Sequence, residues 1–236
     1  MRLDKFLSNH GLGSRKDVKA LLKKKMVTVN DTLVTKSDMK INPETDQIMV
    51  QGEAIHFEPY VYLMLNKPAG VVSSTQDKDK TVIELIEGFD HYELHPVGRL
   101  DKDTEGLLIL TNDGQFSHDV LSPKKHVNKT YYAQIAGIVT EATIETFLKG
   151  ITLDDGYHTM PGELLIINID KAQQTSEIEL VIQEGKFHQV KRMFEAVDMK
   201  VTYLKRIKMG GLTLDTHLKP GEYKKLTQDE INLVRK

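Results

Sequence analysis

The densest group of side chains that could do chemistry lies in residues 98–106, which read Gly-Arg-Leu-Asp-Lys-Asp-Thr-Glu-Gly. Asp101, Asp103 and Glu105 place three carboxylates within five residues, directly before an apolar run. Such carboxylates could bind a divalent cation, or one of them could act as a nucleophile if a nearby cation kept it ionised. Asp101 is the better candidate for a functional carboxylate, because it lies beside Arg99 in a loop that leads into a strand.

The spacing of Asp101, Asp103 and Glu105 matches only the start of a calcium-binding loop. Such a loop needs a bidentate Glu at its twelfth position, where this chain has Asn112, and apolar residues fill the interval. No pair of histidines has a convincing third ligand, and we interpret His188 as a structural residue at a helix start. The chain has no cysteine, which excludes disulfides, thiolate metal sites and a cysteine nucleophile. We therefore expect no metal site.

A cation for Asp101 is available in residues 184–194, where a glycine turn opens a predicted helix. Lys191 and Arg192 flank the apolar face of that helix. Either could pair with Asp101 or bind a phosphate near the helix start. Spacing alone favours the alternative, a surface helix whose basic side chains are solvated.

The elements that position these residues indicate an α+β domain. Its sheet is expected to be mixed and largely antiparallel, flanked by helices. Strands are predicted at 61–65, 107–110, 130–136 and 177–182, and helices at 82–86, 141–148, 187–197 and 229–235. Capping residues support two of these helices: Thr140 with Gly150 beyond the end, and Thr227 with Glu230.

The first 58 residues are predicted to form a separate unit of two short helices and a β-hairpin. Ser14 and Asp17 form a capping-box start for the second helix, and alternating residues at 27–34 indicate the hairpin. Glu58-Pro59 is a plausible linker, so we expect domains at 1–58 and 59–236. The second helix carries a basic stripe, composed of Arg15, Lys19 and Lys23 at helical spacing with Lys16 beside it.

Charge is segregated along the chain, although the formal net charge is only −2. Residues 1–30 carry eight bases against two acids, and residues 186–208 carry seven against two. Residues 141–184 carry nine acids against two bases. Local basic blocks can bind phosphates through counterion release even in a neutral protein, although a solvated charged face is the alternative.

The composition indicates a soluble globular protein. Of 236 residues, 39% are hydrophobic and 28% charged, and the apolar runs are far shorter than the roughly 18 to 20 residues that span a bilayer. The first residues are charged and lack the apolar region of a secretory signal. We expect no membrane association, a cytoplasmic location and a monomer.

Several motifs resemble those of bacterial rRNA pseudouridine synthases. Residues 2–7 and 14–16 look like a small RNA-binding domain shared with a small-subunit ribosomal protein. The motifs of the catalytic domain follow in order: Lys67-Pro68-x-Gly70, Gly98-Arg99-Leu100-Asp101-x-x-Thr104-x-Gly106-Leu107-Leu108, Lys129-Thr130-Tyr131, and residues 185–193. The match spans nearly the whole chain, and its closest type is the enzyme that acts on small-subunit 16S rRNA.

The resemblance implies isomerisation of a uridine to pseudouridine without cofactor or metal. It makes Asp101 the catalytic aspartate, Tyr131 the active-site tyrosine that stacks on uracil, and Lys191 the basic partner of Asp101, with Arg192 as the other choice. Arg99 would fill the gap left by a flipped nucleotide, and Leu204 would form the pocket floor. RNA contacts are further expected from Arg192, Lys67, Arg2, Arg15, Lys16, Lys19 and Lys23, with rRNA or a ribosomal subunit assembly intermediate as the partner.

Three alternatives remain open from the sequence. The chain could modify large-subunit 23S rRNA, or it could be a non-catalytic RNA-binding factor in ribosome assembly. A metal-dependent phosphodiesterase using Asp101, Asp103 and Glu105 is the third, and it would lose activity on chelation. The sequence does not identify the uridine, and a core aromatic in a strand is the alternative reading of Tyr131.

Overall fold

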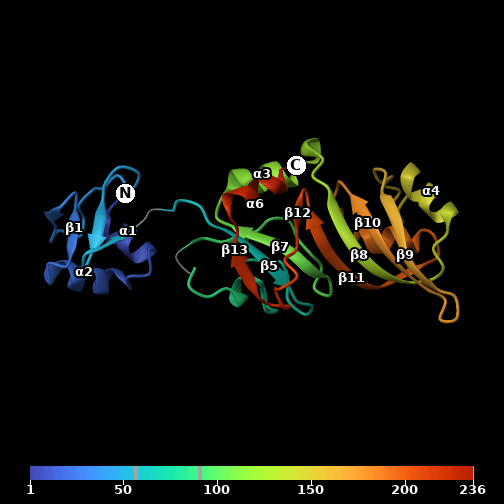
Figure 1. The fold of residues 1–236 in the computed structure, drawn as a ribbon, viewed down its shortest axis with the longest axis horizontal. Helices are drawn as coiled ribbons and strands as arrows, with labels where there is room; N and C mark the ends of the chain where they lie inside the picture. The colour runs from blue at the N-terminus through green and yellow to red at the C-terminus, as the bar shows by residue number, and fades with distance from the viewer. Residues whose placement is uncertain (56–57, 90–91, 236) are drawn as a thin grey trace. The chain divides into compact units, whose positions relative to one another are not determined.

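The structure is a computed structural model, which describes residues 1–55, 58–89 and 92–235. The chain divides into two compact units (Figure 1). The first comprises Met1–Val61 with Glu87–Glu93, and the second comprises Tyr62–Ile86 with Leu94–Lys236. Within the described ranges, no helix is long and apolar enough to cross a membrane.

The first unit contains two short helices and a small antiparallel sheet. The helices are α1 (Leu3–Asn9) and α2 (Arg15–Lys23), and the sheet has the order β2-β1-β3-β4. Its strands are β1 (Val27–Val29), β2 (Thr32–Leu33), β3 (Ile48–Val50) and β4 (Glu53–Ile55). The predicted capping box of α2 is confirmed, since the Ser14 hydroxyl accepts from the Asp17 amide while the Asp17 carboxylate accepts from Ser14.

The predicted hairpin is also confirmed. Asn30 and Asp31 join β1 to β2 with φ values of 49° and 60°, which is the left-handed conformation that a two-residue hairpin requires and that Asn and Asp tolerate. Apolar side chains from both helices and from β1 and β3 form one buried core. The charged side of α2 is thereby left in solvent, because Val18 and Leu22 face the core.

The second unit is built on one sheet that contains nine of the described strands. Its main path is β13-β5-β7-β11-β8-β10-β9, with β6 paired to β7 and β12 paired to β11. The bounds are β5 (Tyr62–Lys67), β6 (His95–Pro96), β7 (Glu105–Thr111), β8 (Lys129–Ala136), β9 (Glu163–Asp170), β10 (Thr175–Ile182), β11 (Lys200–Met209), β12 (Leu212–Thr213) and β13 (Tyr223–Lys225). The described pairs are antiparallel except β7 with β11, so the expected mixed, largely antiparallel sheet is confirmed.

Helices cover this sheet in two places. Figure 1 shows α3 (Gly114–Leu121) and α6 (Gln228–Val234) together over the β5–β7 part, where their apolar residues join Met64, Leu107 and Ile109 in a buried core. Near β9 and β11, α4 (Glu141–Lys149) and α5 (Gln189–Glu195) meet through Phe147 and Phe194, whose rings lie 4.8 Å apart. Short 3-10 turns occur at η1 (Ile83–Leu85) and η2 (Pro123–Lys125).

The capping signals at 140 and 227 are confirmed at the starts of α4 and α6. Helix α3 and several strands are absent from the sequence prediction. Helix α3 begins directly after β7, where the Asp113 side chain caps it by accepting from the Phe116 amide. The edge strand β9 was also absent from the prediction, because its run of Leu and Ile at 164–167 lacks alternation with polar residues.

Candidate active site

The Asp101 loop is held against the sheet by its two ends. It leaves β6 and enters β7, where Gly106 has a φ of 103° and lies opposite Arg206 of β11 in the parallel pair. A Cβ at Gly106 would come within 2.2 Å of the Arg206 carbonyl oxygen. Glycine is therefore required for this close approach, which brings the Asp101 loop next to β11.

The buried side chain of Lys67 also holds the Asp101 loop in place, through hydrogen bonds to its backbone. Its side chain is fully buried, and its ammonium donates to the carbonyl oxygens of Pro68, Asp101, Lys102 and Thr104 at 2.8 to 3.3 Å. Burial lowers the pKa of Lys67 to about 8, against the opposing charges of the three neighbouring carboxylates. The expectation that Lys67 contacts RNA is thus corrected, because an enclosed ammonium has no access to a phosphate.

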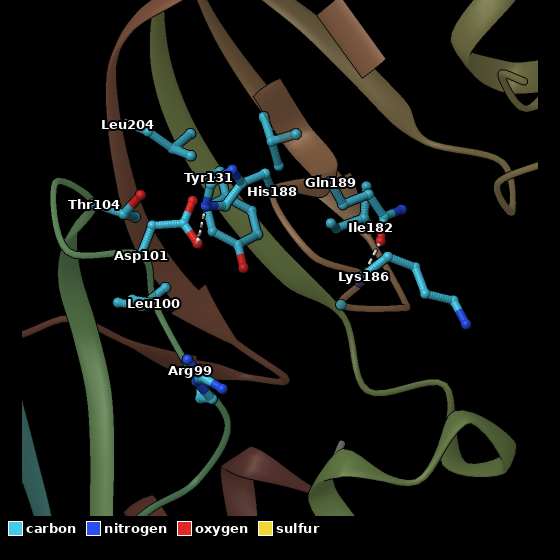
Figure 2. A pocket seen from close by; sticks show the side chains of 12 residues that line it. Arg99, Leu100, Asp101, Thr104, Tyr131, Ile182, Lys186, His188, Gln189 and Leu204 are labelled. Atoms are coloured by element: carbon cyan, nitrogen blue, oxygen red, sulfur yellow. Dashed lines mark hydrogen bonds and ion pairs between the residues drawn. The ribbon is translucent and has the colours of Figure 1, made fainter. Parts of the chain in front are cut away.

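The carboxylate of Asp101 lies at an open pocket with charged and aromatic neighbours (Figure 2). Its Oδ2 is 3.2 Å from the Lys191 ammonium, and its Oδ1 is 3.6 Å from Nε2 of His188. About a quarter of the Asp101 side chain is exposed, so the group is accessible to a ligand while it is paired. Figure 2 shows the Tyr131 ring and the His188 imidazole converging on this carboxylate.

Lys191 pairs with two carboxylates at once. Its ammonium donates to Asp103 at 2.7 Å in addition to its contact with Asp101. Partial burial alone would lower the pKa of Lys191, but the hydrogen bonds and charges of Asp103 and Asp101 raise it above its usual value. The same hydrogen bond lowers the pKa of Asp103, so both partners remain charged around neutral pH.

Arg192, the neighbouring residue, points to different acids. Its guanidinium forms ion pairs with Asp154 and Asp155 and donates to the Phe187 carbonyl oxygen at 3.3 Å. The choice between the two cations is therefore resolved in favour of Lys191 as the partner of Asp101. Arg192 instead fixes the loop before α5, and only 15% of its side chain is exposed for an RNA contact.

Tyr131 and Leu204 lie on one face of the sheet and line the pocket. Tyr131 on β8 is 7% exposed, and Leu204 on β11 is 6% exposed. The alternation along β8 turns Tyr132 to the other face, where its hydroxyl donates to Glu177. The remaining pocket residues are Arg99, Leu100, Thr104, Ile182, Gly185, Lys186, His188, Gln189 and Val190.

Arg99 and the N-terminal cations occupy different environments. Arg99 is exposed at the pocket, and it forms no ion pair within the described part of the chain. Arg15, Lys16, Lys19 and Lys23 are exposed on α2. Arg2 differs, because its guanidinium binds the buried carboxylate of Asp4 at 2.7 Å and thus has a structural role in α1, although half of the side chain stays exposed.

The three acids of the loop do not converge on one point. Glu105 accepts from the Tyr203 hydroxyl at 2.7 Å, whereas Asp103 binds Lys191. No group of three or more His, Asp or Glu side chains among the described residues is arranged to hold a metal ion. The metal-dependent phosphodiesterase alternative therefore has no supporting geometry in these residues.

Sequence reasoning missed the role of His188. It begins α5 as expected, but in a left-handed conformation with φ of 48°, and its imidazole faces Asp101. Gln189 was likewise not singled out. It is 4% exposed, and its side chain accepts from the Lys186 amide and donates to Glu184. The sequence did contain a signal for both residues, because both belong to the motif at residues 185–193 that resembles a family motif.

Comparisons with known proteins identify both units. The family model described as RNA pseudouridylate synthase matches residues 61–196, and the S4 domain model matches residues 1–48. A crystal structure of a pseudouridylate synthase is 38% identical, with a TM-score of 0.69 over 99% of each chain.

Relatives of nearly the same length agree with this assignment. An uncharacterized RNA pseudouridine synthase of Bacillus subtilis is 44% identical over 99% of this chain and 98% of its own. Ribosomal small subunit pseudouridine synthase A of Yersinia pestis is 41% identical over 99% and 98%. Ribosomal large subunit pseudouridine synthase B of Bacillus subtilis is 39% identical over 99% and 95%. The chain belongs to the RNA pseudouridine synthase family, as an enzyme with an N-terminal S4 domain.

Proposed function

We propose that this enzyme isomerises one uridine of small-subunit 16S rRNA to pseudouridine, with Asp101 as the nucleophile. The observation that carries the proposal is the accessible Asp101 carboxylate, ion-paired with Lys191 beside the Tyr131 ring. An accessible carboxylate beside an ammonium can act as a nucleophile in covalent catalysis. The name of the small-subunit relative supports the choice of 16S rRNA.

The reaction is an isomerisation, so it needs no co-reactant. The bond between the ribose and N1 of uracil breaks, the base rotates, and a bond forms from the ribose to C5. The proton on C5 is lost to solvent, and N1 gains a proton. Asp101 assists by attack on the uridine nucleotide, either at the base or in a route through elimination at the sugar, and is released unchanged.

Each neighbouring residue has a role that fits its position. The uridine must leave the RNA stack to reach Asp101, at a cost of a few kcal/mol. The Tyr131 ring would stack on the extruded uracil above the apolar floor formed by Leu204. Arg99, exposed at the same pocket, would fill the gap that the nucleotide leaves. The exposed Arg and Lys side chains of α2 would bind phosphates and orient the RNA without reading its sequence.

Tritium release from transcripts labelled at C5 of uracil tests the proposal. The wild-type protein is expected to release label from 16S rRNA, or from a partly assembled small subunit, and not from 23S rRNA. Asp101→Asn should reduce release to background. Asp103→Asn is the matched control, because it makes the same change on the same loop at a carboxylate that also binds Lys191, and it should retain activity within about tenfold.

Other outcomes separate the alternatives. Release from 23S rRNA alone would replace the small subunit with the large subunit as substrate. Salt-dependent binding without release from either rRNA or from subunits would favour the assembly-factor alternative. Loss of release in excess chelator would contradict an aspartate mechanism that needs no metal.

A further inference from the structure

Phe187 is exposed in an unusual way for a large apolar side chain. At 74% exposure, it is the most exposed of the large hydrophobic side chains in the described residues. It lies in the turn between β10 and α5, directly before His188. Burial of this ring by a ligand would gain the free energy that its exposure forgoes, and its chain neighbours Lys186 and His188 line the pocket.

One face of the Phe187 ring is already occupied. It stacks on the His188 imidazole with ring centroids 3.8 Å apart and an angle of 18° between the planes. His188 in turn faces Asp101 at 3.6 Å. The two rings therefore extend the pocket outward from the catalytic carboxylate, and the exposed area of Phe187 lies at the outer end of this aromatic pair.

Hydrogen bonds hold the turn that contains Phe187 in place. Arg192 donates to the Phe187 carbonyl oxygen at 3.3 Å and is itself fixed by Asp154 and Asp155. The Gln189 side chain accepts from the Lys186 amide at 2.9 Å. A ring held in this way loses little conformational freedom when a ligand stacks on it, which favours binding.

The charge around the ring favours a nucleic acid over an apolar protein surface. Of the cations near the ring, Lys191 and Arg192 are paired with carboxylates, whereas Lys186 is exposed. Arg99 is a further exposed cation at the same pocket. Aromatic rings among such cations are the arrangement by which proteins bind unpaired nucleotides, because every base has a face that can stack.

We propose that the outer face of Phe187 stacks on a nucleobase adjacent to the uridine that enters the pocket. The proposal rests on the function proposed above and adds a requirement on the substrate. The flanking nucleotide must be unpaired, or become unpaired, for its base to reach Phe187. The preferred RNA is then a loop or an opened helix end, not a continuous duplex.

The test measures binding of two fluorescein-labelled RNAs of about twelve nucleotides by fluorescence anisotropy at fixed salt. One is oligouridine, and the other has the same backbone with abasic sites in place of the bases. Phe187→Ala should weaken oligouridine binding about fivefold or more and leave abasic binding unchanged. Phe187→Tyr should retain the wild-type affinity. Leu165→Ala, at another exposed apolar residue, on β9, should have no effect.

The proposal is overturned if Phe187→Ala binds oligouridine as the wild type does. It is also overturned if the variant loses equal affinity for the abasic RNA, because the effect would then not come from stacking. Failure of the isomerase proposal would appear separately, as absence of tritium release from wild-type protein. The binding comparison can still be made in that case, with Asp101→Asn as the background, since it does not depend on turnover.

Discussion

Lys191 and Arg192 show how two adjacent cations of the same charge acquire different functions. They occupy successive positions of α5, so their side chains leave the helix in different directions. Lys191 meets Asp101 and Asp103, whereas Arg192 meets Asp154 and Asp155. The direction of the side chain, and not its charge, decides which of them contacts the Asp101 carboxylate.

This difference predicts unequal effects of substitution. Lys191→Met removes the cation from Asp101 and should lower the rate of isomerisation by about 100-fold or more at saturating RNA. Arg192→Met leaves that pair intact and should reduce the rate by less than about tenfold. Single-turnover tritium release measures both. Equal losses in the two variants would contradict the assignment of Lys191 as the partner of Asp101.

The ion pair between Lys191 and Asp103 predicts a pH dependence of stability. The pKa of Asp103 is lowered in the folded protein, so the pair stabilises the fold above the ordinary carboxylate pKa and is lost as pH falls. The pKa of Lys191 is raised, so the contribution is present below its ordinary value of 10.5 and is lost only above it. The pair is therefore intact throughout the range from pH 5 to 9.

Urea unfolding of the wild type and Asp103→Asn at several pH values measures this effect. The difference in the free energy of unfolding should be constant between pH 5 and 9 and should shrink below about pH 4. The difference will be small, because most of the Asp103 side chain is exposed. A difference that changes between pH 6 and 8 would show that another titrating group controls the pair.

At the scale of elements, the Asp101 loop depends on one buried lysine, Lys67. Lys67→Met removes the donor to four backbone carbonyl groups of the Pro68 and Asp101–Thr104 segments. We expect a loss of about 1–3 kcal/mol in the free energy of unfolding and a fall in kcat, since the position of Asp101 becomes less fixed. Lys102→Met is the control, because that side chain is half exposed and pairs with Asp79, which is also half exposed.

The two Lys variants are compared by urea unfolding and by tritium release. Lys102→Met should change stability by no more than about 0.5 kcal/mol. A Lys67→Met protein with wild-type kcat would show that the loop holds its geometry without the ammonium.

Gly106 controls the pairing of β7 with β11. In Gly106→Ala the new methyl group would overlap the Arg206 carbonyl oxygen, so the strands must separate or the loop must shift. We expect a loss of more than about 2 kcal/mol in the free energy of unfolding and strongly reduced activity. Gly70→Ala is the matched control, since its φ is 88° but no atom lies within 4 Å of the added carbon.

The control separates backbone strain from steric overlap. Gly70→Ala should cost only the left-handed penalty of about 1–2 kcal/mol. Thermal or urea unfolding of both variants measures the difference. Equal costs would mean that the sheet adapts to the methyl group at Gly106.

At the scale of the whole molecule, charge segregation predicts that the N-terminal unit contributes to RNA affinity. Replacing Arg15 and Lys19 by Gln should reduce the slope of log affinity against log salt by about 1.4 to 1.8. The rate at saturating RNA should not change, because phosphate contacts position the RNA and do not take part in the reaction. Replacing Lys149 and Lys171, exposed lysines in the acidic segment, should leave the slope unchanged.

Filter binding of rRNA transcripts at several salt concentrations measures these slopes. An unchanged slope for the Arg15 and Lys19 variant would show that the basic stripe of α2 is only a solvated face. A lower maximal rate in that variant would mean that α2 also affects the catalytic step.

Local structure could be predicted from the sequence because its causes are local. The capping boxes at Ser14, Thr140 and Thr227 each join residues three positions apart, and the Asn30-Asp31 hairpin depends on two backbone angles. Residues of the candidate site could also be predicted, since Asp101 and Tyr131, which belong to separate motifs, line one pocket together with Leu204, which the family resemblance placed there.

The partners of charged side chains were decided only by the tertiary structure. Lys191 binds Asp103 across 88 positions of the chain, and Lys67 binds Thr104 across 37. No local pattern distinguishes Lys67 from an exposed lysine, and it is the packing of β5 against the Asp101 loop that encloses it. The sequence by itself determined the starts of α2, α4 and α6 and the hairpin. The fold decided burial and pairing, because these depend on which distant strands become neighbours in the sheet.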